Sequence, residues 1–413
     1  MDQPQDQSPL DPSIPTPYLT ISEWLATQAL EGSEIEPLFE SLCERMRLAG
    51  ISVARATVMW PALHPLFLAE QVVWTRDNGV RHIRYDDPDG PPLEWLTSPL
   101  YHLLKSDGTI LRRHLSGPQQ LVDFPLLEEL AREGFSDYIG LKTHLTAPRV
   151  GSGSTGILTG WVCDRPSGFS DREVAGIDRL QRRFAVAFRA AVLSGMMRTI
   201  CDVYLGPTAG SRVLNGQIRR GDGETITAVV WYADMRGSTA LAEHMPRDDY
   251  LDLLNRYFEC TAGAVSAHGG ETLAFIGDAV LAIFPYDTDD ACSHAARCAI
   301  AAAREALVRR DAANSTGGPA ISFGIGLSHG PVMFGNIGVP DRLSFSVIGP
   351  TVNEVARLED QTKRLDVSVA ASSSFATLVP EIWQSYGRHH LHGIAGDSEI
   401  FGLRDDIGKA TGL

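Results

Sequence analysis

Apolar and polar residues follow two rhythms along residues 18–195, and together they predict one mixed α/β domain. The segment IEPLFESLCERMRLAG carries apolar residues three and four positions apart, which predicts an amphipathic helix; these residues are Ile35, Leu38, Phe39, Leu42 and Met46. The runs SVARATVMW, QVVW, HIRY and GILTGWVCD are rich in β-branched and aromatic residues and predict strands. We therefore expect a mixed sheet covered by helices.

A long helix is predicted to follow this sheet. Ser170 and Glu173 in SDRE have the spacing of a capping box, which marks a helix start. The apolar stripe of this helix is interpreted as domain core plus a dimer seam, and it consists of Val174, Ile177, Leu180, Phe184 and Phe188. The most apolar stretch, FAVAFRAAVLSGMM, is interrupted by Arg189 and is shorter than the ~20 residues that span a bilayer, so we expect no membrane span.

The segments around this first domain have the composition of tails and linkers. Residues 1–17 are rich in Pro, Gln and Asp, which is typical of a disordered tail, and they lack the pattern of a signal peptide. Residues 196–226 are expected to form a helical linker, in which Gly206-Pro207 ends one helix and a short second helix follows. Residues 227–404 alternate between strand-like and helix-like runs, which predicts a second α/β domain before a short tail at residues 405–413.

An acidic residue lies at the centre of the strongest hairpin pattern in this second domain. In ETLAFIGDAVLAIF, two apolar runs are joined by Gly-Asp, so Asp278 is expected at the tip of a hairpin. Asp is a good turn residue, and on the hairpin alone that role is sufficient. Upstream, ITAVVWYADMRGST predicts a strand that ends at Asp234, followed by a tight turn at Gly237 and a helix capped by Ser238 or Thr239.

These two patterns together indicate a site for metal ions and phosphate. A helical crossover between Asp234 and Asp278 can bring the end of the first strand beside the hairpin tip. Paired carboxylates are hard oxygen ligands for divalent cations, and the helix start near Gly237 offers free N–H groups to phosphate. Alone, Asp234 is more simply explained as a residue that precedes a helix cap.

A third element, FSVIGPTVNEVARLED, predicts a strand, a Gly-Pro turn and a helix that carries Asn353 and Arg357 four residues apart on one face. A permanently charged, forked guanidinium suits a transition state with growing charge on phosphoryl oxygens. The alternative is an ordinary solvated helix with an Arg357–Glu354 ion pair.

Composition narrows the class of partner. The 413-residue chain is 44% hydrophobic and 21% charged, as in soluble globular proteins, and its formal net charge is −15. That charge argues against nucleic acid and anionic lipid as partners, but permits a small anionic substrate if metal ions intervene. The six cysteines lack the spacing of zinc sites or of a disulfide framework, so we expect free thiols in the cytoplasm.

Both halves resemble known families. The segment LHP after a strand, with DRPSGFSDREV leading into a terminal helix, resembles a GAF-type sensor domain. ADMRGST, GGETLAFIGDAVLAIF, GIGLSHGPVMFGNIG and VIGPTVNEVARLE, in this order, resemble a class III nucleotidyl cyclase catalytic domain. The resemblance implies a ferredoxin-like fold for the second domain and conversion of a nucleoside triphosphate, by preference ATP, to a 3′,5′-cyclic nucleotide.

The same resemblance implies roles for single residues. It implies a homodimer with two shared sites, in which Asp234 and Asp278 of one protomer hold two Mg²⁺ or Mn²⁺ ions. Asn353 and Arg357 come from the other protomer, where Asn353 orients the ribose and Arg357 stabilises the α-phosphoryl transition state. The sensor domain is expected to bind a small molecule and to regulate the enzyme.

Three positions depart from the family pattern. Where ATP-specific members often carry a Lys, this chain has Ala274, and Ser346 replaces an Asp or Thr that reads the base. His392 takes the place of a Lys that contacts the triphosphate, and with His389 and His390 it could instead suggest a metal site, although a solvated strand end is favoured. GTP or a pyrimidine nucleotide therefore remains an alternative substrate. A catalytically silent nucleotide-binding module is a further alternative, whereas a diguanylate cyclase is disfavoured because its signature is absent.

Overall fold

A computed structural model describes residues 16–62, 67–86, 92–145, 156–394 and 396–404. The chain divides into two compact units, Met1–Thr199 and Ile200–Leu413. The predicted mixture of helices and strands is confirmed in both units. Residues 1–15 and 405–413 of the expected tails, and residues 63–66 with the LHP segment, lie outside the described residues.

The N-terminal unit is built on one antiparallel sheet of six strands in the order β3-β2-β1-β6-β5-β4. The strands are β1 (Arg55–Pro61), β2 (Ala69–Thr75), β3 (Gly79–Tyr85), β4 (Ile110–His114), β5 (Asp137–His144) and β6 (Gly156–Cys163). The four predicted strands correspond to β1, β2, β3 and β6, whereas β4 and β5 were not predicted. Successive side chains alternate between the two faces, so each face packs against its own helices.

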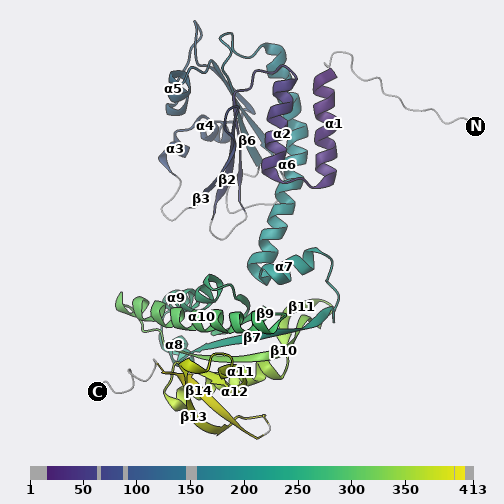
Figure 1. Cartoon of the computed structure of the whole chain (residues 1–413). Coiled ribbons are helices and arrows are strands. Elements are labelled where there is room, and N and C mark those ends of the chain that lie inside the picture. Colours follow the sequence, from purple (N-terminus) through teal and green to yellow (C-terminus); the bar gives the residue numbers. More distant parts are fainter. Residues whose placement is uncertain (1–15, 63–66, 87–91, 146–155, 395, 405–413) are drawn as a thin grey trace, which may run out of the picture. The chain divides into compact units, whose positions relative to one another are not determined.

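Helices cover both faces of this sheet (Figure 1). On one face, Ala56, Val58 and Trp60 of β1 pack with α1 (Thr16–Glu31), α2 (Ile35–Leu48) and α6 (Asp171–Leu205). On the other face, Met59 belongs to a second core formed with the shorter helices α4 (Pro99–Lys105) and α5 (Pro125–Arg132), beside α3 (Leu93–Leu96). The amphipathic helix predicted from residue 35 is confirmed as α2; α1 begins at Thr16, two residues inside the expected tail.

The long helix α6 is apolar on more than one side. Its predicted stripe lies in the core of the N-terminal unit: Ile177, Leu180, Phe184 and Phe188 are buried and Val174 packs against them. The core role is therefore confirmed, and the idea that these same residues form a dimer seam is wrong, because their own unit covers them. Among the described helices, α6 alone has the length and hydropathy of a membrane span, and 33% of its most apolar window is buried. A core helix of a soluble protein passes the same test.

Glycine and proline divide the chain after α6 as predicted. Gly206 adopts a φ of +84°, which ends α6, and Pro207 begins the short helix α7 (Pro207–Leu214). The strand β7 (Gly223–Met235) then includes the last four residues of the expected linker, 223–226.

The C-terminal unit contains an eight-stranded sheet. Seven strands follow the order β13-β14-β12-β10-β7-β9-β8, and β11 pairs with the far half of β10. Besides β7 they are β8 (Glu271–Ile276), β9 (Ala279–Tyr286), β10 (Phe323–Val339), β11 (Arg342–Ile348), β12 (Val369–Ser372), β13 (Trp383–His390) and β14 (Asp397–Leu403). The pairs β10-β7, β7-β9 and β9-β8 are all antiparallel, so the end of β7 lies beside the β8–β9 turn.

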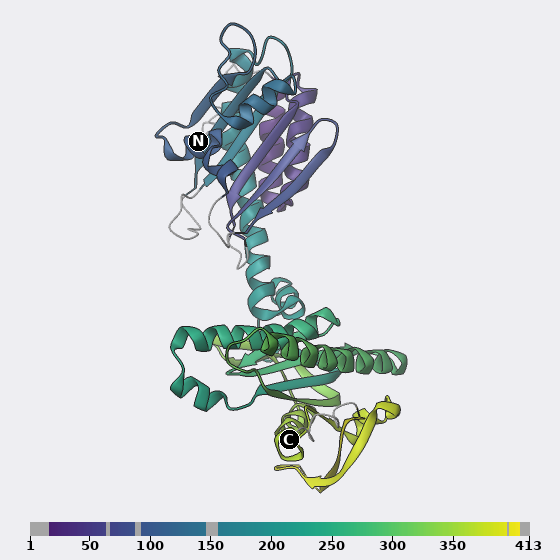
Figure 2. The same ribbon diagram turned by 90° about the vertical axis from the view of Figure 1, so that its left-hand side faces the viewer.

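Helices again cover both faces of the sheet (Figures 1 and 2). One face packs against α9 (Arg247–Ala267) and α10 (Asp289–Ser315) through Val229, Trp231 and Ala233 of β7. The opposite face, with Ala228 and Val230, packs against α7 and α11 (Pro350–Leu365). Two short helices, α8 (Ser238–His244) and α12 (Ser373–Ala376), complete the unit. Because Asp234 has the parity of Ala228 and Val230, its side chain belongs to the face of α11.

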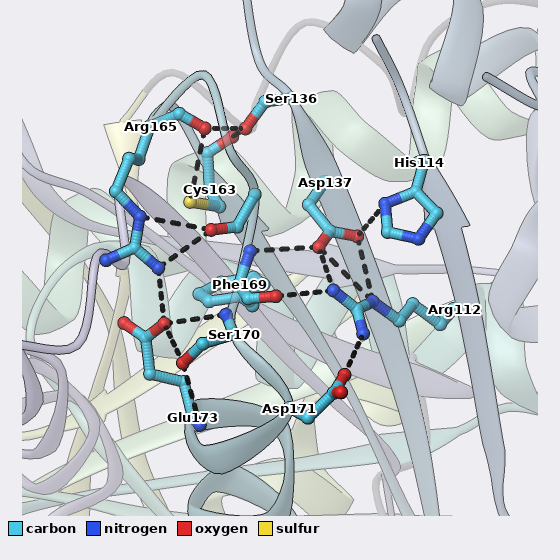
Figure 3. A network of polar contacts seen from close by, with 11 residues as sticks. Arg112, His114, Ser136, Asp137, Cys163, Arg165, Phe169, Ser170, Asp171 and Glu173 are labelled. Atoms are coloured by element: carbon cyan, nitrogen blue, oxygen red, sulfur yellow. Dashed lines mark hydrogen bonds and ion pairs between the residues drawn. The ribbon is translucent and has the colours of Figure 1, made fainter. Parts of the chain in front are cut away.

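A polar network fixes the start of α6 to the first sheet (Figure 3). Asp137 is fully buried at the start of β5 and accepts hydrogen bonds from the Arg112 guanidinium (2.7 Å) and the Phe169 N–H (3.0 Å). Beside it, Glu173 accepts from the Ser170 N–H (2.8 Å), and its own N–H donates to Ser170 Oγ (3.3 Å), so the predicted capping box is confirmed. Burial acts to raise the pKa of Glu173, but hydrogen bonds from Arg165 and Ser170 outweigh it and lower this pKa.

We predict that Asp137→Ala lowers the free energy of unfolding by about 2–4 kcal/mol, because the Phe169 N–H loses its acceptor and the Arg112 guanidinium loses its buried carboxylate, keeping only the Phe169 carbonyl oxygen and the exposed Asp171. The matched control is Asp123→Ala, which breaks a more exposed pair with Arg113 and should lose less than about 1 kcal/mol. Urea unfolding of the full chain, followed by tryptophan fluorescence, measures both. Equal losses in the two variants would contradict the structural role of Asp137.

Candidate active site

Two aspartates come together at the ends of neighbouring strands. Asp234 lies near the end of β7 and pairs in register with Ala279, the residue that follows Asp278. Asp278 occupies the turn between β8 and β9, as predicted, where Gly277 before it has a φ of +65° that glycine adopts readily. The strand β7 continues one residue past Asp234, to Met235. Strand register thus brings two carboxylates that are 44 positions apart in the sequence to one edge.

The neighbouring carboxylate of Asp278 disfavours ionisation of Asp234. Burial raises the pKa of Asp234, and the Asp278 carboxylate raises it further, whereas Lys363 opposes both effects. The Lys363 ammonium lies 3.5 Å from Asp234 Oδ2, and the side chain of Asp234 is 27% exposed. A like charge beside a half-buried carboxylate disfavours ionisation, so the pair favours a cation in its vicinity.

Hard divalent cations fit these residues. Asp278 directly precedes Ala279, the residue opposite Asp234 in the sheet, so the two carboxylates belong to neighbouring strand ends. Both side chains are partly shielded from water, and a dication would relieve the repulsion between them. Asp234 and Asp278 are therefore the residues that would hold Mg²⁺ or Mn²⁺. No group of three or more His, Cys, Asp or Glu side chains with metal-site geometry occurs in the described residues, so the alternative of a histidine site at residues 389–392 gains no support.

The expected phosphate site near Gly237 differs from the prediction in its detail. Gly237 has a φ of +75° and is itself the N-cap of α8, with no side-chain cap. The predicted capping by Ser238 or Thr239 is wrong, because Ser238 is already the first helical residue. Glycine takes this position since a left-handed residue is needed to turn the chain from β7 into the helix.

The helix α11 carries Asn353 and Arg357 as predicted. Asn353 is exposed, and the ion pair of Arg357 within the described ranges is a long contact, 3.5 Å, with Asp360. The alternative Arg357–Glu354 pair is wrong, because Glu354 instead accepts a hydrogen bond from Ser328 (2.6 Å). Within the described residues, no hydrogen bond or ion pair joins Asn353 or Arg357 to the two aspartates.

A buried acid on α11 was not predicted. Glu359 is 1% exposed and makes no ion pair within the described chain. Burial raises its pKa to about 7; Lys363 opposes this effect and Asp234 adds to it. A Cβ at Gly324 of β10 would lie 2.5 Å from Glu359 Oε1, so glycine is needed there for α11 to pack this closely. Its neighbours in the sequence, Arg357 and Asp360, are polar, so the local pattern does not indicate that Glu359 is buried.

The three positions that differ from the family pattern are Ala274, Ser346 and His392. Ala274 is on β8 and Ser346 on β11, two strands that contact each other, and both residues are half-buried. Ser346 pairs in register with Gly335 of β10. His392 is exposed in the turn after β13. No polar contact of the described residues connects any of the three to Asp234 or Asp278.

Comparison with known proteins agrees with this geometry. Residues 223–391 match the family model of the adenylate and guanylate cyclase catalytic domain. An adenylate cyclase of Anabaena cylindrica is 32% identical over 183 residues, which cover 44% of this chain and 36% of that protein. The uncharacterized protein Rv1319c of Mycobacterium tuberculosis is 36% identical over 151 residues, which cover 37% of this chain and 27% of that protein. The alignment thus spans about a quarter to a third of these relatives' length.

Among solved structures, a bacterial light-regulated adenylyl cyclase is 27% identical, with a TM-score of 0.38 over 44% of this chain and 92% of the other.

We predict that Glu359→Gln stabilises the protein at high pH. The carboxyl group has a pKa near 7 when folded and about 4.3 when unfolded, so between these values the folded state keeps a proton that the unfolded state has lost. Stability of the wild type therefore falls as pH rises from about 4 to 7, and an uncharged Gln escapes this loss. The variant should be more stable than the wild type by about 2–4 kcal/mol at pH 8 and by much less at pH 4.5.

Urea unfolding without added divalent cations at both pH values measures this difference. The control is Glu381→Gln, at an exposed acid outside α11, and it should not reproduce the gain in stability at pH 8. The same stability gain for Glu359→Gln at both pH values would contradict the raised pKa.

Proposed function

We propose that residues 223–391, which match the family model of the adenylate and guanylate cyclase catalytic domain, form such a domain, and that the protein is an enzyme that converts a nucleoside triphosphate to its 3′,5′-cyclic nucleotide and pyrophosphate. The observation that carries this proposal is the convergence of Asp234 and Asp278 at adjacent strand ends, with a raised Asp234 pKa. Paired carboxylates in this state suit metal-assisted displacement at phosphorus.

In the proposed reaction, the ribose 3′-oxygen forms a bond to the α-phosphorus while the bond from that phosphorus to the bridging oxygen breaks. The 3′-hydroxyl loses its proton and pyrophosphate departs with the electron pair of the broken bond. Asp234 and Asp278 would hold the divalent ions, Mg²⁺ or Mn²⁺, which when bound favour ionisation of the hydroxyl and neutralise the triphosphate. Lys363 would move away from Asp234 or share it, since its contact is long at 3.5 Å.

Asn353 and Arg357 supply the second set of groups in this proposal, with Asn353 on the ribose and Arg357 on the α-phosphoryl oxygens. Arg357 is available for this role because its one ion pair is long and half-exposed. Along α11 it lies about 9 Å from Lys363, and Asn353 lies about 15 Å away, at 1.5 Å per residue. Lys363 is the residue of α11 that contacts Asp234, so Asn353 and Arg357 are separated from the aspartates of their own chain. This separation supports a site in which Asn353 and Arg357 come from a second protomer.

A second face of α6 supports a homodimer. Apolar residues follow one another here at alternating spacings of four and three, which is the pattern of a coiled-coil seam; they are Val186, Ala190, Leu193, Met197, Ile200 and Tyr204. All but Ala190 are 40–79% exposed in the single chain, so this stripe differs from the core stripe of the same helix. A second copy of α6 would cover it.

The base preference is proposed to be for ATP, because adenylate cyclases are among the curated relatives. Ala274 offers no hydrogen bond to a base, and the Ser346 hydroxyl both donates and accepts. GTP or a pyrimidine nucleotide is accordingly the alternative substrate. A nucleotide-binding module without turnover is the second candidate, because Lys363 already supplies a positive charge to Asp234.

We further propose that the N-terminal unit is a GAF-like sensor that regulates the cyclase, and that the C-terminal unit is ferredoxin-like. The six-stranded sheet with helices on both faces supports the first assignment, and the antiparallel order β10-β7-β9-β8 supports the second. All six cysteines are free thiols, which supports a cytoplasmic location. The α6 stripe is then assigned to a protein partner and not to a membrane.

The proposed activity is tested by incubating the full chain with each of the four ribonucleoside triphosphates and Mg²⁺ or Mn²⁺, with products identified by mass spectrometry. We expect a cyclic nucleotide, most of it from ATP, and loss of turnover by at least about 100-fold in Asp278→Asn, which keeps a turn-forming residue but removes the charge. The control Asp287→Asn, at an exposed aspartate after β9, should retain full activity. Wild-type protein that is dimeric but makes no cyclic product would support the silent module.

The shared site predicts that two inactive variants restore each other. Asp278→Ala and Arg357→Ala should each be inactive, but a mixed dimer has one site with both lesions and one site with neither. Random pairing makes half of the dimers mixed, so activity should recover to about a quarter of the wild type per protomer. Mixing Asp278→Ala with Asp234→Ala is the control and should recover nothing, because both lesions affect the metal pair. No recovery in samples whose mixed dimers are proved by tagged pull-down would contradict the shared site.

A further inference from the structure

The N-terminal unit contains a cavity of about 820 Å³ that has no part in the proposed catalysis. It lies between the sheet and the short helices α3, α4 and α5, on the face opposite α1, α2 and α6. Cavities that hold small organic molecules have about this volume, and they combine apolar walls with a few fixed polar groups. Here the apolar wall is formed by Met59, Val73, Ile83, Trp95, Leu100 and Val162.

The sheet lacks side chains on one side of the cavity, because two glycines are paired there. Gly140 of β5 and Gly160 of β6 are paired in register, and Gly160 is also opposite Thr57 of β1. A Cβ at Gly160 would lie only 2.9 Å from Thr57 Cγ2 and 3.2 Å from the Tyr138 hydroxyl. The missing side chains leave room for the Tyr138 ring, whose hydroxyl group ends over the glycine row.

Tyr138 has a buried hydroxyl without a partner. The residue is 2% exposed, and no hydrogen bond to its Oη exists within the described chain. The neighbouring polar groups of the cavity are satisfied: Tyr85 donates to Gln71 (2.5 Å), and Gln71 donates to Thr57 (2.7 Å). A buried donor without an acceptor costs free energy, so its persistence beside a cavity points to a ligand that accepts from it.

The charged group nearest to this hydroxyl is a cation. Arg55 of β1 lines the cavity and lies in the same row of the sheet as Tyr138, joined through Val162 between them. Burial raises the pKa of Tyr138, and the charge of Arg55 opposes that effect, in keeping with their proximity. Arg55 is 3.9 Å from Glu133 and makes no hydrogen bond to it, so its donors are largely uncommitted.

Other charges line the cavity at more exposed positions. These charges have both signs, and all four side chains are exposed: Arg81 and Arg132 are positive, and Glu94 and Glu129 are negative. They lie at exposed positions, whereas the pair of donors formed by the Tyr138 hydroxyl and the partly buried Arg55 guanidinium has no hydrogen-bond acceptor within the described residues. Its complement is an acceptor with negative charge.

We propose that this cavity binds a small apolar organic carboxylate, with its carboxylate on Tyr138 and Arg55 and its ring or hydrocarbon body against the apolar wall. A guanidinium and a hydroxyl that donate side by side match the two oxygens of a carboxylate. The apolar wall and the volume favour an aromatic or branched body over a strongly hydrated one. The proposal does not depend on the cyclase activity, because binding is measured directly.

The test uses 1-naphthylacetate, its uncharged analogue 1-naphthylacetamide, and octanoate, titrated into the full chain by calorimetry. We expect the aromatic acid to bind at least about 10-fold more tightly than the amide, since only the acid has a charge for Arg55. Equal affinity for acid and amide, or no binding of either acid at millimolar concentration, would overturn the proposal.

The matched variant is Tyr138→Phe, which removes one oxygen atom. It should weaken acid binding about 10-fold and, because the unpaired hydroxyl is gone, raise the unfolding temperature of the free protein by about 2–4 °C. The control Tyr18→Phe, whose ring packs against α6 on the other side of the sheet, should change neither. Unchanged acid affinity in Tyr138→Phe would contradict the assigned contact.

Arg55→Met gives an independent test if the tyrosine variant does not fold. It keeps an apolar stem and removes the cation, so the preference for acid over amide should disappear while amide binding stays. Persistence of that preference in Arg55→Met would overturn the carboxylate assignment.

Discussion

Repulsion between two carboxylates is the constraint around which the C-terminal unit is arranged. Burial raises the pKa of Asp234, and the neighbouring Asp278 carboxylate raises it further. Strand register leaves them no freedom to separate, because Asp234 is opposite Ala279 and Asp278 is bound into the preceding turn. The unit therefore holds a negative site that a cation stabilises. In the free chain that cation is Lys363.

The helix α11 connects this pair to the rest of the site. It packs closely on β10 because Gly324 and Gly326 have no side chains; a Cβ at Gly326 would lie 2.3 Å from the Val355 carbonyl oxygen. The inner face of the helix carries the buried acid Glu359, which avoids a third negative charge by holding a proton near neutral pH. Its outer face presents Arg357 with one long ion pair. The helix α11 therefore carries a protonated acid on its buried face and an arginine side chain on its exposed face.

Sequence patterns predicted the turns and helix caps correctly where these depend on residues that are close together in the sequence. The capping box at Ser170 and Glu173 and the Gly-Asp turn before Ala279 were confirmed because turn and cap chemistry acts over a few residues. The contact of Lys363 with Asp234 joins residues 129 positions apart, and no local rule could reveal it.

Periodicity also failed where an element is apolar on two sides. In α6, the stripe that includes Phe184 is covered by its own sheet, whereas the stripe that includes Met197 is not. A helical repeat identifies apolar faces but does not say which neighbour covers each one. The missed strands β4 and β5 have a similar cause, because β5 mixes Asp, Gly and Lys with apolar residues and its burial comes from the fold around it.

Buried polar side chains with hydrogen-bond partners have structural roles in this protein, whereas a buried polar side chain without a partner can indicate a binding site. Asp137 is fully buried, but the hydrogen bonds it accepts account for its charge, so it belongs to the scaffold. Tyr138, the next residue, is equally buried and has no partner. An unpaired donor is not sufficient by itself, since Trp231 and Tyr257 also lack partners while packed inside the core of the C-terminal unit. Tyr138 differs because it borders a cavity that also contains Arg55. The unpaired hydroxyl, the cation and the space beside them together define a binding site, and none of the three would do so alone.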